Sequence, residues 1–300
     1  MTRRPSGPTP ERGARLDERL VRDGLAETRE RAQAAVLAGR VTVDGTLADK
    51  PGRRVTPAMR VAVTAPAHPY VGRGGIKLVH ALAAFGVDVG DAVAVDLGAS
   101  TGGFTDCLLQ RGAARVYAVD VGRGQLAWRL RHDPRVVVME ETNARTLTPE
   151  AVGGPRDLVT ADLSFISLRL VWRAIAGLVR AGGDVVALVK PQFEAGRAAV
   201  GRGGVVRDPA VHIAVLEDAL AASVREGLEP AGVTASPVAG PAGNIEYFVH
   251  LKKRAAAEVR GGGNGAGRVL EPSGLDIREV VEVAHARFGG RAVREGRRGA

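Results

Sequence analysis

The sequence is poor in cysteine and in long apolar runs. Cys107 is its only cysteine, which excludes an internal disulfide bond and is typical of a protein of the reducing cytoplasm. Because Cys107 lies in an apolar helical run, we interpret it as a small core residue and not as a nucleophile. No apolar run approaches about 18 residues, so we expect no membrane-spanning helix. Residues 1–11 are basic and proline-rich without an apolar core, which is typical of a disordered leader and not of a signal peptide.

Acidic residues are in the minority. Lysine and arginine total 42 against 33 aspartates and glutamates, which gives a formal net charge of +9 and a pI of about 10.5. A balance this basic favours a polyanionic partner, of which nucleic acid is the first candidate. The alternative is a codon bias that favours arginine without any such partner. Clustering of the basic residues would distinguish the two.

The first part of the chain predicts a small domain of its own. Residues 12–64 begin with leucines at helical spacing, and a second helical stretch follows before Gly39. Short alternating runs at 41–45 and 60–63 predict strands. Two helices and short strands in about 50 residues indicate a compact α+β module.

A longer domain follows a proline-containing linker at residues 65–72. Across residues 73–254, short valine-rich runs alternate with helical stretches, a pattern that predicts βα repeats around a buried parallel sheet. The predicted strands lie at 92–98, 115–121, 135–140, 157–164, 184–190, 232–238 and 245–253. Residues 255–300 form a glycine-rich linker and a tail, in which 275–288 has the spacing of an amphipathic helix. The expected fold class of the longer domain is therefore α/β.

The first predicted strand of this domain ends in a glycine-rich turn, DLGASTGG, at residues 96–103. In an open α/β sheet, ligands bind beyond the carboxyl ends of the strands, where this turn lies. The turn lacks the second glycine of the nicotinamide fingerprint G-x-G-x-x-G. Asp120 ends the next strand, and a carboxylate there can accept both ribose hydroxyls of NAD or of S-adenosylmethionine. Asn143 follows the third strand, near the position expected for an adenine.

Each of these features also has a simpler structural interpretation. The glycine turn can be a tight βα connection capped by Ser100 or Thr101. Asn143 can be an ordinary turn residue. A glycine turn alone is a weak signal, but in combination with Asp120 it favours a bound ligand over a purely structural turn.

Four charged residues stand at the ends of predicted elements, and two of them, Asp162 and Lys190, lie at the edge of the sheet where the glycine turn also lies. Asp162 ends the fourth strand and Lys190 the fifth, Glu246 starts a late strand, and Lys77 starts the helix before the first strand. Any one of them is by default a solvated surface charge. Brought together at this edge, a lysine and an aspartate can shift each other's pKa, and a lysine among other cations can deprotonate and act as a base. Such a base can activate a ribose hydroxyl.

Several stretches together resemble one known family. They are DLGASTGGFTDCLLQRGA, VYAVDVGRGQLAWRLRHDPRVVVMEETNARTL, DLVTADLSFISL, LVKPQFEAGR, GGVVRDP and GNIEYF. Over roughly residues 12–253, the chain resembles the TlyA family of ribosomal RNA 2′-O-methyltransferases, also labelled haemolysin A. The resemblance implies an amino-terminal S4 RNA-binding domain and a Rossmann-like, FtsJ-like methyltransferase domain. It also implies S-adenosylmethionine as cofactor, no metal, and methylation of cytidine ribose in small-subunit ribosomal RNA and, in one subgroup, in large-subunit RNA as well.

The resemblance also implies catalytic roles. FtsJ-like enzymes carry a Lys-Asp-Lys-Glu tetrad, which here corresponds to Lys77, Asp162, Lys190 and Glu246. Lys190 would be the base, and Asp162 and Lys77 would tune and position it. Glu246 would orient the ribose or hold Lys77. Phe165 either lines the pocket or is a buried aromatic residue between strand and helix.

Binding roles follow from the same resemblance. The implied cofactor contacts are Gly98, Ser100, Thr101, Gly103, Phe104, Asp120, Val121 and Asn143. The implied RNA contacts are Arg12, Arg15, Arg19, Arg29, Arg40 and Arg73. The density of basic residues in the first domain fits phosphate contacts better than it fits codon bias. Residues 255–300 extend beyond the usual end of the family and receive no role.

Two other classes of function stay open. A non-catalytic RNA- or ribosome-binding protein would use the large domain as a scaffold, and the complete tetrad argues against it. A membrane-active haemolysin is suggested by the family label, and the lack of a spanning segment argues against a pore. We expect ribosomal RNA or ribosomal subunits as partners, no membrane partner, and a cytoplasmic monomer.

Overall fold

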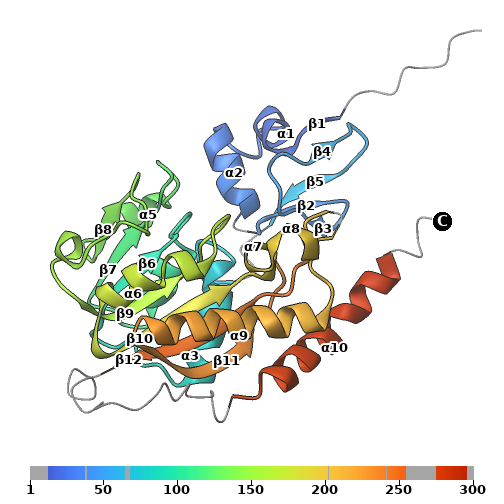
Figure 1. The fold of residues 1–300 in the computed structure, drawn as a ribbon. Helices are drawn as coiled ribbons and strands as arrows, with labels where there is room; N and C mark the ends of the chain where they lie inside the picture. Colours follow the sequence, from blue (N-terminus) through green and yellow to red (C-terminus); the bar gives the residue numbers. More distant parts are fainter. Residues whose placement is uncertain are drawn as a thin grey trace, which may run out of the picture. The chain divides into compact units, whose positions relative to one another are not determined.

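A computed structural model of the chain describes residues 13–37, 39–64, 68–201, 203–240, 242–254 and 275–295, with side chains to residue 288. The chain divides into two compact units between Arg73 and Gly74 (Figure 1). The leader expected at residues 1–11 lies outside the described residues, as do 65–67 of the expected linker and 255–274 of the tail.

The first unit is a small α+β fold. Its helices are α1 (Leu16–Arg22) and α2 (Arg29–Leu37). Its strands are β1 (Ala14–Arg15), β2 (Val41–Val43), β3 (Thr46–Leu47), β4 (Arg54–Val55) and β5 (Val61–Val63). β2 pairs antiparallel with β3 and β5, and β1 pairs with β4. Leu16 and Leu20 lie four residues apart on one face of α1 and meet Val36 of α2 in the core, which confirms the predicted helices.

The second unit is built on a seven-stranded sheet. Its strands are β6 (Val93–Leu97), β7 (Arg115–Val119), β8 (Val136–Met139), β9 (Arg156–Ala161), β10 (Val179–Val189), β11 (Leu228–Ala235) and β12 (Tyr247–Lys253). Their order is β11-β12-β10-β9-β6-β7-β8. The pairs β10–β9, β9–β6, β6–β7 and β7–β8 are parallel. In contrast, β12 is antiparallel to both of its neighbours, β10 and β11. All seven predicted strands are confirmed, and so is the α/β class.

The strand order reverses beside β6. The chain continues from β6 outward through β7 to β8 and then returns to β9 on the other side of β6. Open α/β sheets bind ligands beyond the carboxyl ends of the strands at such a switch point. β12 runs in the opposite direction, and its first residue, Tyr247, pairs with Val189 at the end of β10. Residues that precede β12 therefore lie at the same edge of the sheet as residues that follow β9 and β10.

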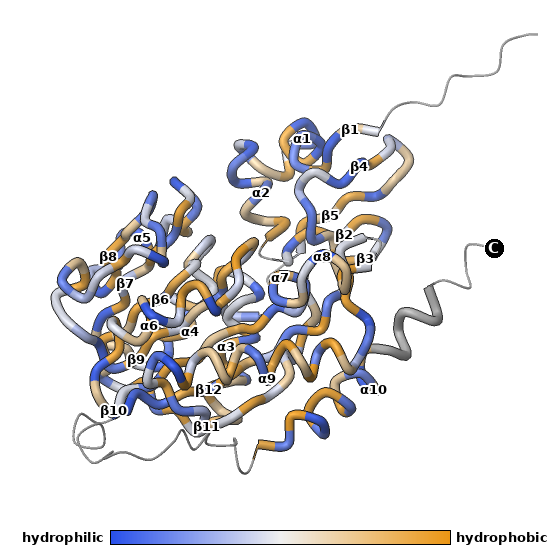
Figure 2. The backbone as a smooth tube through the Cα atoms, in the orientation of Figure 1, coloured by the Kyte–Doolittle hydropathy of each residue, from blue (hydrophilic) through white to orange (hydrophobic). Residues whose placement is uncertain are grey.

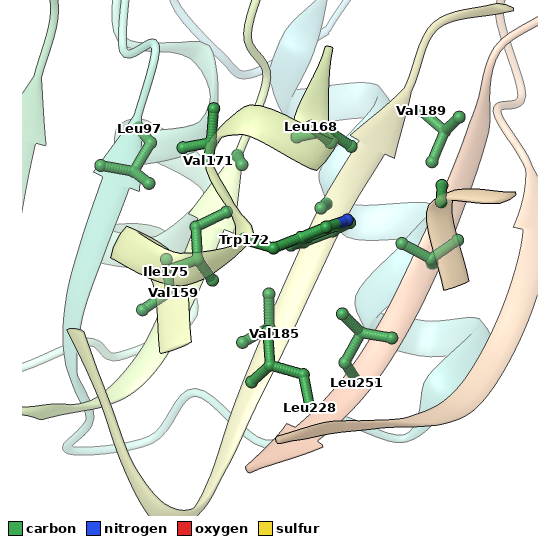
Figure 3. Close-up of a cluster of buried hydrophobic side chains, with 14 of the residues drawn as sticks. Leu97, Val159, Leu168, Val171, Trp172, Ile175, Val185, Val189, Leu228 and Leu251 are labelled. Atoms are coloured by element: carbon green, nitrogen blue, oxygen red, sulfur yellow. The ribbon is translucent and has the colours of Figure 1, made fainter. Parts of the chain in front are cut away.

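One face of this sheet is covered by α6 (Trp172–Leu178), α9 (Pro209–Arg225) and α10 (Ile277–Glu295) (Figure 1). Their apolar side chains join one buried cluster with alternate residues of β12, beginning at Tyr247. Trp172 is fully buried in this cluster, and Figure 3 shows its ring among leucine, isoleucine and valine side chains. This core holds β9, β10 and β12 in fixed register, and with them the residues at their ends.

The other face carries α3 (Gly74–Phe85) and α4 (Gly103–Gln110), which pack against each other. Phe104 stacks on Phe248, one of the β12 residues that point away from the first cluster. Cys107 of α4 is fully buried, which confirms its assignment as a core residue. Short helical turns complete the unit: α5 (Trp128–Arg131), η1 (Pro149–Val152), η2 (Leu168–Leu170), α7 (Pro191–Glu194) and α8 (Gly196–Ala199).

The tail adds a further helix to this unit. α10 confirms the amphipathic helix predicted at residues 275–288, and apolar and polar residues alternate along it in Figure 2. Ile277, Val281 and Ala284 recur at helical spacing and are buried in the main cluster. The part of the tail that the structure describes is therefore an integral layer of the second unit.

Candidate active site

The glycine turn lies between the ends of β6 and β9. Gly98 has a φ of 84°, and its N–H donates to the carbonyl of Val119 at 2.8 Å. A Cβ at Gly98 would lie 2.7 Å from the carbonyl oxygen of Asp162, so a side chain does not fit there. Gly103 opens α4, and a Cβ there would lie 3.1 Å from the Cα of Gly74 on α3. These glycines bring the turn close to both β9 and α3.

The carboxylate of Asp120 binds backbone N–H groups of the glycine turn and of its own loop after β7. It accepts hydrogen bonds from the N–H groups of Ser100 at 2.8 Å and Gly122 at 2.7 Å. Each oxygen keeps acceptor capacity for a further donor such as a ribose hydroxyl. Asn143 forms a local turn, in which its Oδ1 accepts from the N–H of Arg145 at 3.0 Å, and it borders an open cavity of about 610 Å³. Both residues thus have a structural role, and the cavity at Asn143 is lined by neither Asp120 nor the glycine turn.

The other predicted cofactor residues differ in exposure. Val121 is exposed. The backbone carbonyl of Thr101 accepts a hydrogen bond from the N–H of Ala127 at 3.1 Å. Phe104 is only 3% exposed and stacks on Phe248. Its side chain belongs to the core, because the first turn of α4 points it towards β12. The cofactor contact predicted for Phe104 stays a prediction, and its backbone is better placed for it than its buried ring.

Four separate elements bring the predicted tetrad together. Lys77 lies in the first turn of α3, and Asp162 directly follows β9. Lys190 directly follows β10, and Glu246 directly precedes the antiparallel β12. The strand directions place the last three at one edge of the sheet, and the close approach of α3 to the glycine turn adds Lys77.

The four residues form two lysine–carboxylate ion pairs. Nζ of Lys77 lies 2.5 Å from Oε2 of Glu246, and Nζ of Lys190 lies 2.6 Å from Oδ1 of Asp162. Each lysine is only 8% exposed, and Glu246 is 1% exposed. Buried charges are costly unless they are paired, so each lysine needs its carboxylate to be stable at this depth. Water is largely excluded, and electrostatic effects on a reacting group are correspondingly large.

The two ion pairs act on each other. Burial by itself raises the pKa of Asp162, but the charges of Lys190 and Lys77, with a hydrogen bond from Lys190, outweigh it and hold that pKa below its usual value. Asp162 therefore stays ionised at neutral pH and keeps a negative charge beside Nζ of Lys190. The tetrad combines a fixed carboxylate, a lysine next to it, and a second cation within electrostatic range.

Two neighbours of Asp162 complete this site. Nζ of Lys190 donates to Oγ of Ser164 at 2.9 Å, a contact that the sequence did not indicate because serine is common in loops. Phe165 adopts a φ of 63°, which is unusual for a residue other than glycine, and its side chain is 90% exposed. Its ring lies 5.1 Å from that of Phe193. Phe165 is not the buried aromatic residue of the second interpretation.

Asp96 is a buried acid near the end of β6 that was not among the predicted site residues. It is fully buried and accepts hydrogen bonds from Oγ1 of Thr105 at 2.7 Å and from Oγ1 of Thr160 at 3.0 Å. Burial raises its pKa to about 7, and the nearby charge of Asp162 adds to this rise although the two threonines oppose it. The sequence signal that could have identified Asp96 is an acidic residue between apolar residues, directly before the glycine turn.

Asn244 is a second residue that the sequence did not single out. It is buried, its Oδ1 accepts from the N–H of Val206 at 3.0 Å, and its Nδ2 donates to the carbonyl of Gly204 at 2.8 Å. These bonds tie the loop before α9 to the segment that carries Glu246. A Cβ at Gly240 would collide with the carboxylate of Glu246, so the backbone on that side also fixes its position.

Several arginines of the first unit have a structural role. Asp17 is fully buried and accepts hydrogen bonds from Arg15 at 2.8 and 2.9 Å, from Arg29 at 3.2 Å and from Gln33 at 2.8 Å. The hydrogen bond from Arg15 is the main reason that the pKa of Asp17 lies far below its usual value. Arg15 and Arg29 thus neutralise a buried carboxylate, although both guanidinium groups remain partly exposed.

The remaining predicted RNA contacts are placed differently. Arg19 is only 14% exposed, pairs with Asp23 and donates to the carbonyl of Thr56 at 3.1 Å, so it holds the fold of the first unit together. Arg40 directly precedes β2 and is exposed. The side chain of Arg73 lies against Gly39 within the first unit. Arg12 lies outside the described residues.

Comparison with known proteins agrees with this architecture. Residues 70–253 match the FtsJ-like methyltransferase family, and residues 14–61 match the S4 domain. The 16S/23S rRNA (cytidine-2′-O)-methyltransferase TlyA of Mycobacterium tuberculosis strain H37Rv is 53% identical over 243 residues, which are 80% of this chain and 90% of that protein. This chain belongs to the TlyA family. The predicted S4 domain and Rossmann-like methyltransferase sheet are confirmed.

Other TlyA-family matches carry a different name. Hemolysin A of Brachyspira hyodysenteriae is 39% identical over 238 residues, which are 79% of this chain and 99% of that protein. A hemolysin-named structure from Streptococcus thermophilus matches with a TM-score of 0.70 and 43% identity over 94% of this chain and 98% of that chain. Among the helices described for this chain, none is long and apolar enough to cross a membrane.

Proposed function

We propose that this protein transfers a methyl group from S-adenosylmethionine to the 2′-hydroxyl of cytidine in ribosomal RNA. The observation that carries the proposal is the pair of buried ion pairs, Lys77–Glu246 and Lys190–Asp162, beside a glycine turn at the switch point of the sheet. The names of the TlyA-family methyltransferases, which match most of the chain, support this choice of substrate and reaction. The S4 match supports an RNA substrate.

The residues at the switch point fit S-adenosylmethionine. The glycine at residue 98 lets the turn pack tightly against Asp162, the following Ser100 is exposed, and Asp120 offers carboxylate oxygens just after the next strand. We assign the cofactor contacts to Gly98, Ser100, Thr101, Gly103, Asp120, Val121 and Asn143. When bound, S-adenosylmethionine supplies an electrophilic methyl group on a sulfonium sulfur, which departs as a neutral thioether.

The tetrad supplies the proton chemistry. A ribose hydroxyl becomes an effective nucleophile only as its proton is removed, and Nζ of Lys190 in its neutral form accepts that proton. The ammonium that results lies 2.6 Å from the carboxylate of Asp162, which stabilises it. Lys77, held at 2.5 Å by Glu246, places a second positive charge near the developing alkoxide. General-base catalysis of this kind contributes about 10²- to 10⁴-fold to a rate.

The substrate side of the site suits a nucleotide. Phe165 presents an exposed ring from a strained backbone position in the loop that follows β9, and the ring of Phe193 lies 5.1 Å from it. Exposed aromatic rings at RNA-modifying sites stack on unpaired bases, and a strained position is retained only where surrounding structure enforces it. We propose that Phe165 stacks on a base next to the methylated ribose.

The first unit would hold the RNA through its backbone. We propose that Arg40, Arg73 and the exposed edges of Arg15 and Arg29 contact phosphates, since such contacts fix register without reading sequence. Arg19 has no such role in this proposal because it is largely buried. Binding through phosphates weakens steeply as salt rises, which makes the salt dependence of RNA binding a direct measure of these contacts.

Transfer of a labelled methyl group tests the function. Protein, labelled S-adenosylmethionine and ribosomal RNA from cells that lack the gene should give labelled RNA, and Lys190→Ala should lower the rate by about 10²-fold or more. Lys252→Ala is the matched control, because Lys252 is an exposed lysine near the opposite end of β12, where it pairs with Asp184. A protein that binds RNA but neither binds the cofactor in calorimetry nor labels any RNA would be a non-catalytic binder instead.

A further inference from the structure

Trp128 is a large apolar side chain that the proposed mechanism does not use. It opens α5, and its side chain is 75% exposed. The N–H of the preceding residue, Ala127, donates to the carbonyl of Thr101 in the glycine turn at 3.1 Å, so α5 is fastened to the predicted cofactor site. A Cβ at Gly102 would collide with Leu130 of α5, which shows how closely the two segments pack.

The ring of Trp128 packs against a histidine at the end of the same short helix. It lies 4.3 Å from the ring of His132, one helical turn away, and Nδ1 of His132 donates to the backbone carbonyl of Trp128 at 2.8 Å. This hydrogen bond fixes the histidine beneath the tryptophan. The opposite face of the indole is open to solvent, in contrast to the fully buried Trp172 in Figure 3. An exposed ring that is already ordered loses little entropy when a second flat group stacks on it.

The segment that carries Trp128 is rich in arginine. Residues 123–135 contain four arginines and one aspartate. Three of these arginines form ion pairs in which the carboxylate is the covered partner: the exposed fractions are 54% against 6% for Arg129–Asp106, 33% against 15% for Arg131–Glu140, and 46% against 21% for Arg135–Asp133. In these three pairs the guanidinium group is therefore the charge that faces solvent more, although each ion pair as a whole is neutral.

We propose that Trp128 and the arginines of residues 123–135 form a second RNA-binding surface, on which Trp128 stacks on an unpaired base of the substrate. An ordered, exposed aromatic ring in a segment that carries exposed guanidinium groups matches the combination of bases and phosphates in single-stranded RNA. This inference rests on the proposed function, because it takes its ligand from the RNA substrate. It goes beyond that function because it places a second RNA contact at Trp128, beside the glycine turn, in addition to the contact proposed at Phe165.

The protein's two tryptophans make a direct test available. Acrylamide is a neutral quencher that reaches exposed indole, so it quenches Trp128 and spares the buried Trp172. Ribosomal RNA freed of protein should reduce acrylamide quenching of the wild-type protein, and the protectable signal should be absent from Trp128→Phe. S-adenosylmethionine alone should leave the quenching unchanged. Protection by the cofactor alone, or by intact ribosomal subunits but not by their RNA, would overturn the proposal in favour of a cofactor lid or a protein partner.

Kinetics of variants give the second measurement. Loss of one stacking contact by alanine substitution should raise the KM for RNA by about 5- to 100-fold. We expect this for Trp128→Ala, with an unchanged dissociation constant for S-adenosylmethionine, and we expect Trp128→Phe to restore most of the affinity. Val283→Ala, at an exposed apolar position on α10, is the control. An unchanged KM in Trp128→Ala, in an enzyme that does methylate RNA, would refute this surface and leave the proposed function standing.

Discussion

Replacing Asp96 by asparagine should remove a defined part of the pH dependence of folding. Asp96 is fully buried and accepts hydrogen bonds from two threonine hydroxyls, and its pKa is raised from 3.8 to about 7. The folded protein therefore keeps a proton on this carboxyl up to about pH 7, whereas the unfolded chain loses it near pH 4. Unfolding releases that proton between these values, so the stability contributed by Asp96 falls as pH rises through this window.

The expected magnitude follows from the two pKa values of Asp96. A shift of one pKa unit corresponds to about 1.4 kcal/mol, so the full effect of a shift from 3.8 to about 7 is about 4 kcal/mol above pH 7. Between pH 5 and pH 8, the part of the unfolding free energy that depends on Asp96 should fall by about 2.5 kcal/mol. Asparagine has nearly the same shape and does not ionise, so the difference between wild type and Asp96→Asn isolates this term.

Urea denaturation followed by circular dichroism measures the difference at each pH. Asp96→Asn should become more stable relative to wild type as pH rises from 5 to 8, by about 2.5 kcal/mol over the range. Asp91→Asn is the control, since Asp91 is an exposed aspartate on the turn before β6. A pH-independent difference between wild type and Asp96→Asn would mean that Asp96 is ionised in the folded protein, and the account of its burial would be wrong.

Three other substitutions test the site. Gly98→Ala should weaken binding of S-adenosylmethionine about tenfold or more in calorimetry, because it adds strain and a collision at the turn; Gly86→Ala, with a similar positive φ and open space around it, should not. Glu246→Gln should lower kcat about 10²-fold and the free energy of unfolding by about 3 kcal/mol, and adding Lys77→Met should restore stability but not activity, measured by methyl transfer and urea denaturation. Phe165→Ala should raise the KM for RNA about 5-fold or more without changing cofactor affinity, and an equal loss of both would contradict a stacking role.

The strands and the edge at which the tetrad meets were predictable because they depend on local patterns. Valine-rich runs of strand length identify the buried sheet, and a charged residue directly after such a run lies at its carboxyl edge. Asp162 and Lys190 follow from this rule alone. Lys77 and Glu246 needed the resemblance, since the sequence does not state that β12 runs antiparallel or that α3 approaches the glycine turn.

The roles of single side chains depended on packing that the sequence does not reveal. Phe104 and Phe165 are the same residue type near strand ends, yet one is buried against β12 and the other is almost fully exposed. A count of arginines in the first unit cannot separate those bound to the buried Asp17 from those that face solvent, such as Arg40. In each case the deciding fact is a contact between residues far apart in sequence.

Mapping the transferred methyl group on the RNA distinguishes methylation of a ribose from methylation of a base. Ribosomal RNA from cells that lack the gene would be treated with the purified protein and S-adenosylmethionine, and then cleaved with alkali, which spares the bond after a 2′-O-methylated ribose. We expect new resistance to cleavage at a cytidine with the wild-type protein and with Lys252→Ala. We expect no such resistance with Lys190→Ala. Methylation of a base, or resistance that persists in Lys190→Ala, would contradict the proposed function.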